Sequence, residues 1–298
     1  MSSPTGPASG LPVRMPRPRK PGRHRRPEPV TAPEGAPSLV LAVPGQPSSA
    51  SRGLAEEVVS IARAELPGLD ARVAFAEGAD NDEEFPALAG VLAQVAAAER
   101  GGEAGAEWPP AVVVPLLTSP GSAHGEVIRQ AVSDSGTGAA VTDVLGPHPL
   151  LAEAVHVRLS EAGLARADRA RLFTVATAAD GIVLAAVGGE EAVKAAGITG
   201  MLLSARLAVP VLAAALDQEG AVAETANKLL ESGSQQLALA PCAIGPELPE
   251  GLLKSAATEA GCAASEPLGA YPAVGKLVLS AYMTELGINP QQPGAPLR

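Results

Sequence analysis

The sequence contains two copies of one ordered set of landmarks. Residues 145–149 read LGPHP and lead into a helical pattern, and residues 268–272 read LGAYP and lead into another. Earlier in each half, residues 41–45 (LAVPG) correspond to residues 184–188 (LAAVG). A duplication of this kind predicts two similar lobes, and the cleft between such lobes is a natural place for a ligand.

Each half alternates short apolar runs with helical patterns. The clearest run, residues 111–117 (AVVVPLL), is continuously apolar, which is typical of a central strand covered on both faces. Strands that alternate with helices predict a parallel sheet flanked by helices. We therefore predict an α/β protein of two tandem, doubly wound lobes, each a four-stranded parallel sheet covered by helices. The N-terminal lobe is expected over residues 37–165 and the C-terminal lobe over residues 180–287.

The two ends of the chain differ from these lobes in composition. Residues 1–36 are rich in Pro, Gly, Arg and Ser and hold seven basic and two acidic residues, with few large apolar side chains. Such a segment cannot offset the entropy cost of ordering, so we expect a disordered basic tail. Residues 288–298 are expected to form a loose tail as well.

Composition also restricts the possible partners. The chain carries a net charge of −10 and only 2% aromatic residues, so it lacks the stacking platforms of nucleic-acid binders. No apolar run approaches the ~20 residues of a membrane span, and the N-terminus lacks the apolar segment of a signal peptide. We expect a cytoplasmic protein without nucleic-acid or membrane partners. The two cysteines, Cys242 and Cys262, have no metal-binding spacing and are interpreted as buried small residues.

A strand-turn-helix pattern near the N-terminus is the first candidate site. The apolar run at residues 39–43 ends at Pro44 and Gly45, and a serine-rich turn leads into a helical pattern. In open parallel sheets, ligands bind at this end of the strands. We interpret Gly45, Ser48 and Ser49 as candidate ligand-binding residues. The serines suit an anion at the helix N-terminus, and they equally suit an ordinary helix cap.

The order and spacing of these landmarks resemble the sirohydrochlorin and cobalt chelatase family, in its long, duplicated, actinobacterial-type form. The resemblance rests on residues 39–45, 112–117, 145–149 and 268–272 and spans about residues 38–286. It implies a lyase that inserts Fe²⁺ or Co²⁺ into a tetrapyrrole in sirohaem or cobalamin biosynthesis. The divalent metal and the tetrapyrrole would both be substrates.

The resemblance also implies which residues hold the metal. In the family, the first strand ends in a His-Gly pair whose histidine is a ligand, whereas Pro44 precedes Gly45 here and offers no lone pair. A second family histidine follows the third strand, and an ungapped alignment places Ala123 there, with His124 one residue further on. The resemblance therefore makes His124 the candidate catalytic residue and metal ligand, and His148 a second candidate ligand.

Two interpretations of the whole chain stay open. An active chelatase would use the neutral imidazole of His124 to hold the metal and to accept a pyrrole proton. A non-catalytic member with a degenerate ligand set would keep the fold to bind a tetrapyrrole or a protein partner. His148 is also consistent with a structural role at a helix entry, since Tyr271 stands at its place in the second half.

Overall fold

The computed structural model describes residues 31–288, apart from residue 81 and residues 100–107 and 166–177. Most of the two predicted tails, residues 1–36 and 288–298, therefore lies outside the described residues. Where the described chain begins, Ala32 donates its N–H to the carbonyl oxygen of Pro67 at 3.0 Å, so this short stretch is held against the first lobe.

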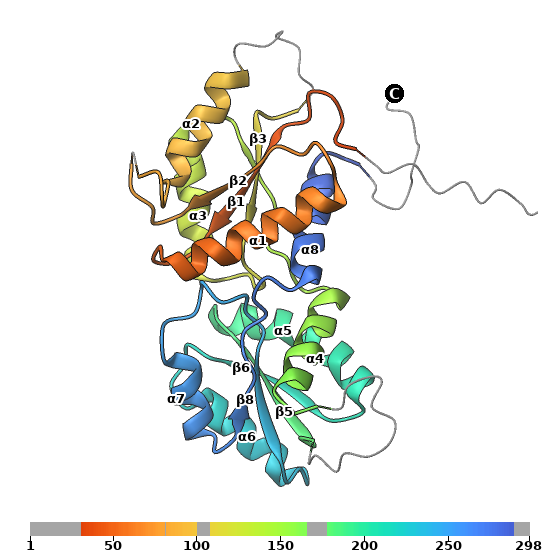
Figure 1. The fold of residues 1–298 in the computed structure, drawn as a ribbon. Helices are drawn as coiled ribbons and strands as arrows, with labels where there is room; N and C mark the ends of the chain where they lie inside the picture. Colours follow the sequence, from red (N-terminus) through yellow and green to blue (C-terminus); the bar gives the residue numbers. More distant parts are fainter. Residues whose placement is uncertain (1–30, 81, 100–107, 166–177, 289–298) are drawn as a thin grey trace, which may run out of the picture.

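The N-terminal half folds around a parallel sheet with the strand order β2-β1-β3-β4 (Figure 1). Its strands are β1 (Ser38–Val43), β2 (Ala71–Phe75), β3 (Ala111–Pro115) and β4 (Ala140–Val141). Leu39 pairs with Ala71 on one side and with Val112 on the other, which makes β1 a central strand. The helices that follow the first three strands are α1 (Ser49–Glu65), α2 (Leu88–Glu99) and α3 (Ala123–Ser135).

The C-terminal half has the equivalent strand order, β6-β5-β7-β8, again parallel throughout. Its strands are β5 (Gly181–Ala186), β6 (Val211–Ala215), β7 (Leu237–Pro241) and β8 (Ala263–Ala264). Between them run α5 (Gly189–Leu207), α6 (Ala221–Glu231) and α7 (Leu252–Glu259). The predicted α/β fold with two four-stranded parallel sheets is confirmed.

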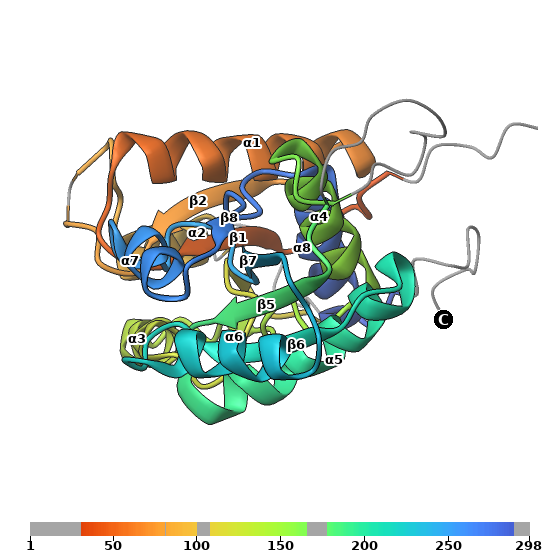
Figure 2. The ribbon, with the colours of Figure 1, turned by 90° about the horizontal axis from the view of Figure 1, so that it is seen from below.

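The last helix of each half packs on the sheet of the other half. Helix α4 (Pro149–Glu161) follows the first sheet in sequence but packs against α5 and β7, and α8 (Pro272–Glu285) packs against α1 and β3. Figure 1 shows α8 beside α1 and α4 beside α5, and Figure 2 shows α4 next to α8, which it contacts. The chain therefore crosses between lobes at residues 145–149 and 268–272, the paired motifs of the sequence repeat.

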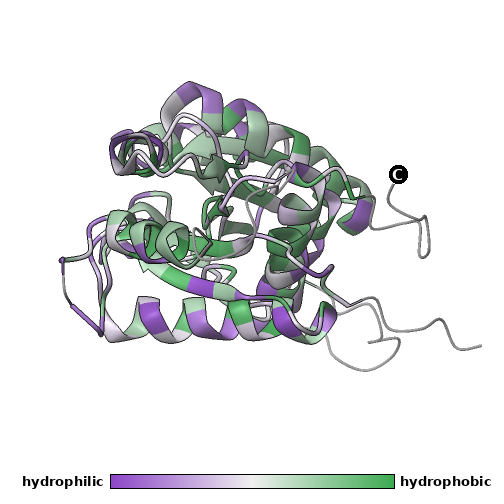
Figure 3. Ribbon diagram, turned by 90° about the horizontal axis from the view of Figure 1, so that it is seen from above, coloured by the Kyte–Doolittle hydropathy of each residue, from purple (hydrophilic) through white to green (hydrophobic). Residues whose placement is uncertain are grey.

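Buried apolar residues lie on both faces of each sheet. In Figure 3 the strands of both sheets are mostly in the hydrophobic colour. One cluster lies between the first sheet and α2 and α3, and another between the second sheet and α6 and α7. The third is continuous between the lobes, because it joins α1 and α8 on the first sheet to α4 and α5 on the second. The exchanged helices thus give the two lobes a shared core.

Close contacts fix α8 on the N-terminal lobe. The hydroxyl of the buried Tyr282 donates to the carbonyl oxygen of Pro37 at 2.7 Å, just before β1 begins. Burial raises the pKa of Tyr282 to about 12, so it stays a donor. At Gly275, an added Cβ would lie 2.5 Å from Cγ2 of Ile61 and 3.2 Å from the carbonyl oxygen of Val58 on α1. The glycine therefore lets the two helices approach closely.

From the sequence alone, residues 118–125 are predicted as a loop and residues 139–145 as a strand, and both boundaries are wrong. The loop after β3 is expected to reach Gly125, but α3 begins at Ala123 because Ser122 caps it, accepting the N–H of Gly125 at 3.2 Å. This places His124 in the first helical turn. Strand β4 is expected over residues 139–145 and has only two residues, because the chain turns away towards the other lobe after Thr142 donates its N–H to Val113.

Replacing Gly275 with alanine should destabilise the protein by about 1–3 kcal/mol, because the added methyl group overpacks the contact with Ile61. Urea unfolding followed by circular dichroism measures this. Gly53→Ala on α1 is the matched control: nothing lies within 4 Å of its added Cβ, so it should stabilise by about 0.5–1 kcal/mol. Equal effects of the two changes would contradict the close packing.

Candidate functional site

The carboxyl ends of the central strands of both sheets meet at the lobe interface. Gly45 follows β1 with φ +72°, and an added Cβ would lie 2.6 Å from the carbonyl oxygen of Pro246 in the other lobe. Gly188 follows β5 with φ +125°, and an added Cβ would lie 2.7 Å from the carbonyl oxygen of Pro120. The two contacts are reciprocal, because each glycine ends the first strand of its lobe and each proline follows the third. Backbone meets backbone here, which only glycine permits.

Polar groups also join the lobes at this interface. The hydroxyl of Thr118 donates to the carbonyl oxygen of Cys242 at 2.5 Å. Beside this bond lies a pocket of about 10 Å³, roughly the space of one water molecule. Its lining comes from both lobes: Leu117, Thr118, Ser119, Ser122, Val187, Cys242, Ala243 and Glu247. A tetrapyrrole is far larger than this pocket, so it does not fit there while the lobes are in this contact.

A carboxyl group is buried in the interface. Glu247 is only 4% exposed, and its two oxygens accept the N–H groups of Ile244 at 2.7 Å and Gly245 at 2.8 Å. Burial raises the pKa of the Glu247 carboxyl above its usual range, against backbone hydrogen bonds from Ile244, Glu247 and Gly245, which lower it. Burial and the nearby Glu247 raise the pKa of the Cys242 thiol to about 12, so Cys242 is protonated and unreactive.

His124 lies at the edge of the same interface, in a group that we call the rim cluster: Gln46, Glu77 and His124. Cε1 of His124 is 3.9 Å from where a Cβ on Gly45 would be. Its Nδ1 is 3.9 Å from Oε1 of Glu77, and the side-chain amide of Gln46 donates to the other Glu77 oxygen. The side chains of His124 and Glu77 are 28% and 31% exposed, so an ion from solvent can reach them.

The rim cluster combines an imidazole nitrogen with a carboxylate oxygen, a mixture that suits first-row divalent ions such as Fe²⁺ and Co²⁺. Ligands of one ion usually lie about 2.0–2.2 Å from it, so a small side-chain shift would let both atoms contact the same ion. Among the residues that the structure describes, no group of three or more His, Cys, Asp or Glu could hold a metal. Two protein ligands are fewer than a structural or catalytic zinc site has, which suits a transferred ion better than a resident one.

His148 caps a helix. It is the N-cap residue of α4, and its Nδ1 accepts the N–H of Leu150 at 3.1 Å. Burial lowers the pKa of His148, so the ring is neutral near pH 7. The cap agrees with the structural role at a helix entry that the sequence indicated for His148. Ligation through its other nitrogen stays a prediction.

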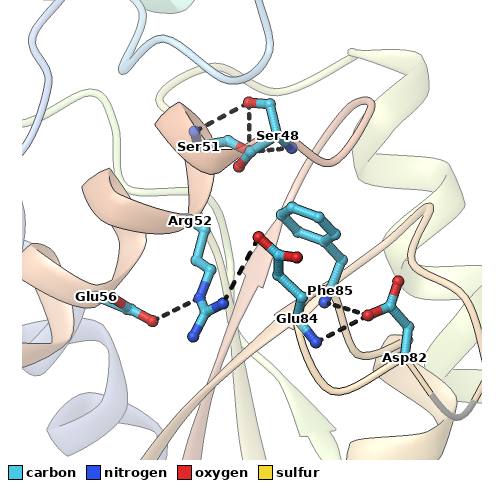
Figure 4. A network of polar contacts seen from close by, with 7 residues as sticks. All are labelled: Ser48, Ser51, Arg52, Glu56, Asp82, Glu84 and Phe85. Carbon is cyan, nitrogen blue, oxygen red and sulfur yellow. Dashed lines mark hydrogen bonds and ion pairs between the residues drawn. The ribbon is translucent and has the colours of Figure 1, made fainter.

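The serines after Gly45 are engaged in a capping box at the start of α1 (Figure 4). The hydroxyl of Ser48 accepts the N–H of Ser51 at 3.1 Å, and the hydroxyl of Ser51 accepts the N–H of Ser48 at 3.0 Å. Next to them, Arg52 forms an ion pair with Glu56. Ser49 is exposed. Anion binding by Gly45, Ser48 and Ser49 remains a prediction beside this capping role.

Sequence reasoning did not single out Glu77 or Glu247. Glu77 stands first in an acidic loop, and its proximity to His124 depends on β2 lying beside β1, which the sequence does not specify. Glu247 lies in the loop after β7, and a glutamate is usually exposed. The weak signal for Glu247 was its position between two prolines, at the carboxyl end of a central strand.

No family model matches the chain, and no curated protein matches it. Among solved structures, the sirohydrochlorin chelatase SirB from Bacillus subtilis subspecies spizizenii, in complex with cobalt, aligns with a TM-score of 0.51 and 16% identity. The alignment covers 84% of this chain and 95% of that one. The chain has a chelatase-like fold. CbiX, described as the terminal enzyme for siroheme biosynthesis in denitrifying bacteria, gives a TM-score of 0.52 at 16% identity over 83% of this chain and 98% of that one.

Structural similarity at such low sequence identity establishes the fold. The activity has to be argued from the residues of the site. In the part of the chain that the structure describes, no helix is long and apolar enough to cross a membrane.

Ser48→Ala should lower the free energy of unfolding by about 1 kcal/mol, because it removes the N-cap of α1. Ser49→Ala, at an exposed position of the same turn, should change it by less than about 0.5 kcal/mol. Urea unfolding measures both. An unchanged stability of the Ser48 variant together with a loss of anion binding would favour the ligand role over the cap.

Proposed function

We propose that the protein is a sirohydrochlorin chelatase-like lyase that brings a divalent metal ion, Fe²⁺ or Co²⁺, to a tetrapyrrole, with His124 as metal ligand and proton acceptor. The observation that supports this most is the position of His124 beside Glu77 and Gly45, at the carboxyl edge of the first sheet. Parallel sheets of this type build their sites at that edge. The chelatase-like fold makes metal insertion the chemistry to test first.

Insertion needs a group that holds the ion and groups that accept two pyrrole protons. Two N–H bonds of the macrocycle break, and bonds from those nitrogens to the metal form in their place. While the ion is bound, Nδ1 of His124 and a carboxylate oxygen of Glu77 donate electron pairs to it. As the ion passes to the macrocycle, both atoms are released and each can take one proton, so the charges balance. Gln46 holds the Glu77 carboxylate through its amide in the meantime.

A second candidate function is binding of a tetrapyrrole or a protein partner without insertion. The observation that favours it is Pro44, a buried residue at the end of β1 that supplies no metal ligand. With one imidazole and one carboxylate, the rim cluster would hold an ion weakly. The fold would then serve recognition rather than catalysis.

One assay distinguishes these two functions. Mixing the protein with sirohydrochlorin and Co²⁺ should change the absorbance faster than the uncatalysed reaction, and His124→Ala should lower that rate by about 10²–10⁴-fold, the usual contribution of a general base. Glu77→Gln should lower it less. Glu84→Gln, an exposed carboxylate in the same loop, is the control and should keep the rate.

The remaining outcomes are equally informative. A spectral shift with the tetrapyrrole alone and no acceleration by the protein would favour the second candidate. Neither a shift nor an acceleration would contradict both. An unchanged rate in His124→Ala would remove the rim cluster from the mechanism.

Pro44→His should increase Co²⁺ affinity by about tenfold or more, comparable with the effect of other changes around metal sites. Position 44 directly precedes Gly45, next to which the His124 ring lies, so the change adds a nitrogen close to the existing pair. Isothermal titration with Co²⁺ measures the affinity. Pro47→His, in the same turn but beyond Gly45, is the matched control and should leave the affinity unchanged. Equal affinity in both variants would mean that position 44 does not face the rim cluster.

A further inference from the structure

Two segments carry the chain between the lobes, residues 145–149 and 268–272, and they are attached in matching ways. Leu145 donates its N–H to the carbonyl oxygen of Leu117 at 2.8 Å, and Leu268 donates to that of Ala243 at 2.9 Å. Both acceptors lie in the loop after the third strand of a lobe. Two crossovers side by side are the geometry of a hinge, in which a few residues absorb a rotation between domains.

In the described part of the chain, two hydrogen bonds tie the exchanged helix α4 to a crossover, whereas one hydrogen bond joins the lobes at the strand ends. On α4, the guanidinium of Arg158 donates to the carbonyl oxygen of Leu268 from Nε at 3.1 Å and from Nη2 at 2.8 Å, which ties the first exchanged helix to the second crossover. At the strand ends, the lobes meet through the two glycine–proline approaches, the approach of Gly121 to Gly188 and Glu191, and the hydrogen bond from Thr118 to Cys242. These are mostly van der Waals contacts, so a rotation about the crossovers would break one hydrogen bond there.

Among the described residues that line the interface pocket, Glu247 is the one with a carboxyl group. Its hydrogen-bond partners, Ile244 and Gly245, are in its own loop, so they move with it when the lobes separate. Among the described residues, no Lys, Arg or His forms an ion pair with it. The Thr118, Ser119 and Ser122 side chains that face it across the interface are uncharged.

The titratable groups around Glu247 do not compensate a negative charge. Cys242 in the same pocket is a protonated thiol. On the elements packed around the pocket, Glu191 of α5 approaches Gly121, and the first turn of α3 carries His124 and Glu126. Arg129 of α3 and Arg52 of α1 are paired with other carboxylates, Glu126 and Glu56 respectively. An ionised Glu247 in the closed interface is therefore a buried charge without a cation partner, which is costly.

We propose that the lobes open and close about residues 145–149 and 268–272, and that Glu247 is a proton-operated latch, neutral when the lobes are closed and ionised when they are open. Opening transfers the carboxyl group to water and uncovers the carboxyl ends of the central strands. It also provides the space that a macrocycle lacks in the closed interface. The latch is a property of the fold and does not depend on which ligand, if any, binds at the rim cluster.

The direction of the pH dependence follows from burial. Burial raises the pKa of Glu247 in the closed form. Closure is therefore fully favoured at pH values below the ordinary glutamate pKa of about 4.3, and it is lost as the pH rises through the raised pKa of the closed form. The closed form thus takes up a proton that the open form releases.

Small-angle X-ray scattering of the full chain tests the latch. The radius of gyration of the wild type should increase between about pH 5 and about pH 8, and Glu247→Gln should remove that step and stay compact. Glu250→Gln, an exposed glutamate in the same loop, is the matched control and should keep the wild-type step. A wild type with no step, or a Glu247→Gln variant that retains it, would overturn the proposal.

If Glu247→Gln fails to fold, a second measurement tests the latch. Cys242 is 2% exposed in the interface, so its alkylation rate at one fixed pH, in a Cys262→Ser background, reports opening. Thr118→Val removes the hydrogen bond between the lobes and should speed alkylation about fivefold, the effect of losing about 1 kcal/mol, while the scattering step with pH remains. Unchanged alkylation in this variant would show that Cys242 is not guarded by lobe closure, which contradicts the latch.

Discussion

The exchange of α4 and α8 between the lobes is the constraint on which the other features depend. Each of these helices leaves the sheet that precedes it in sequence and packs on the other sheet. The chain must therefore cross twice, and both crossings begin beside the loops that follow the third strands. As a consequence, the carboxyl edges of the two sheets face each other, and each lobe covers the strand ends of the other.

Facing edges divide the polar groups of the interface into two kinds. Glu247, Cys242 and Thr118 lie inside, where the space is small and a charge has no partner, and Cys242 stays a protonated thiol there. His124 and Glu77 lie at the edge, partly exposed, where an ion can arrive with its water molecules. The proposed metal chemistry and the proposed control of access would therefore use separate parts of the interface.

Much of the fold could be predicted from the sequence. The continuous apolar runs, such as residues 111–117, and the Gly and Pro residues that end them identify the strands, and the alternation with helices identifies the parallel sheets. The exchange could not be predicted, because the apolar residues of α4 show that the helix is largely buried and not which sheet buries it. The start of α3 was missed because Gly125 weakens the helical pattern, while Ser122 caps the helix earlier.

The candidate site could be predicted only in part, for related reasons. His124 was singled out through the family resemblance, and its role as a ligand stays a prediction. The capping role of His148 was foreseen from its rigid turn. Glu77 depends on the order of strands in the sheet, and Glu247 depends on a lobe contact, so neither position is visible in local patterns. The sequence shows which residue types are present, but it does not show which distant residues the fold brings together.

The contact between the lobes places different requirements on Gly45 and on the residue before it, Pro44. Gly45 is needed for the approach to Pro246, because any side chain there would meet that carbonyl oxygen. Position 44 carries no such requirement in the contact, since the reciprocal turn of the second lobe has Val187 before its glycine. A metal ligand at position 44 is therefore compatible with the closed interface, and the proline is not a consequence of closure.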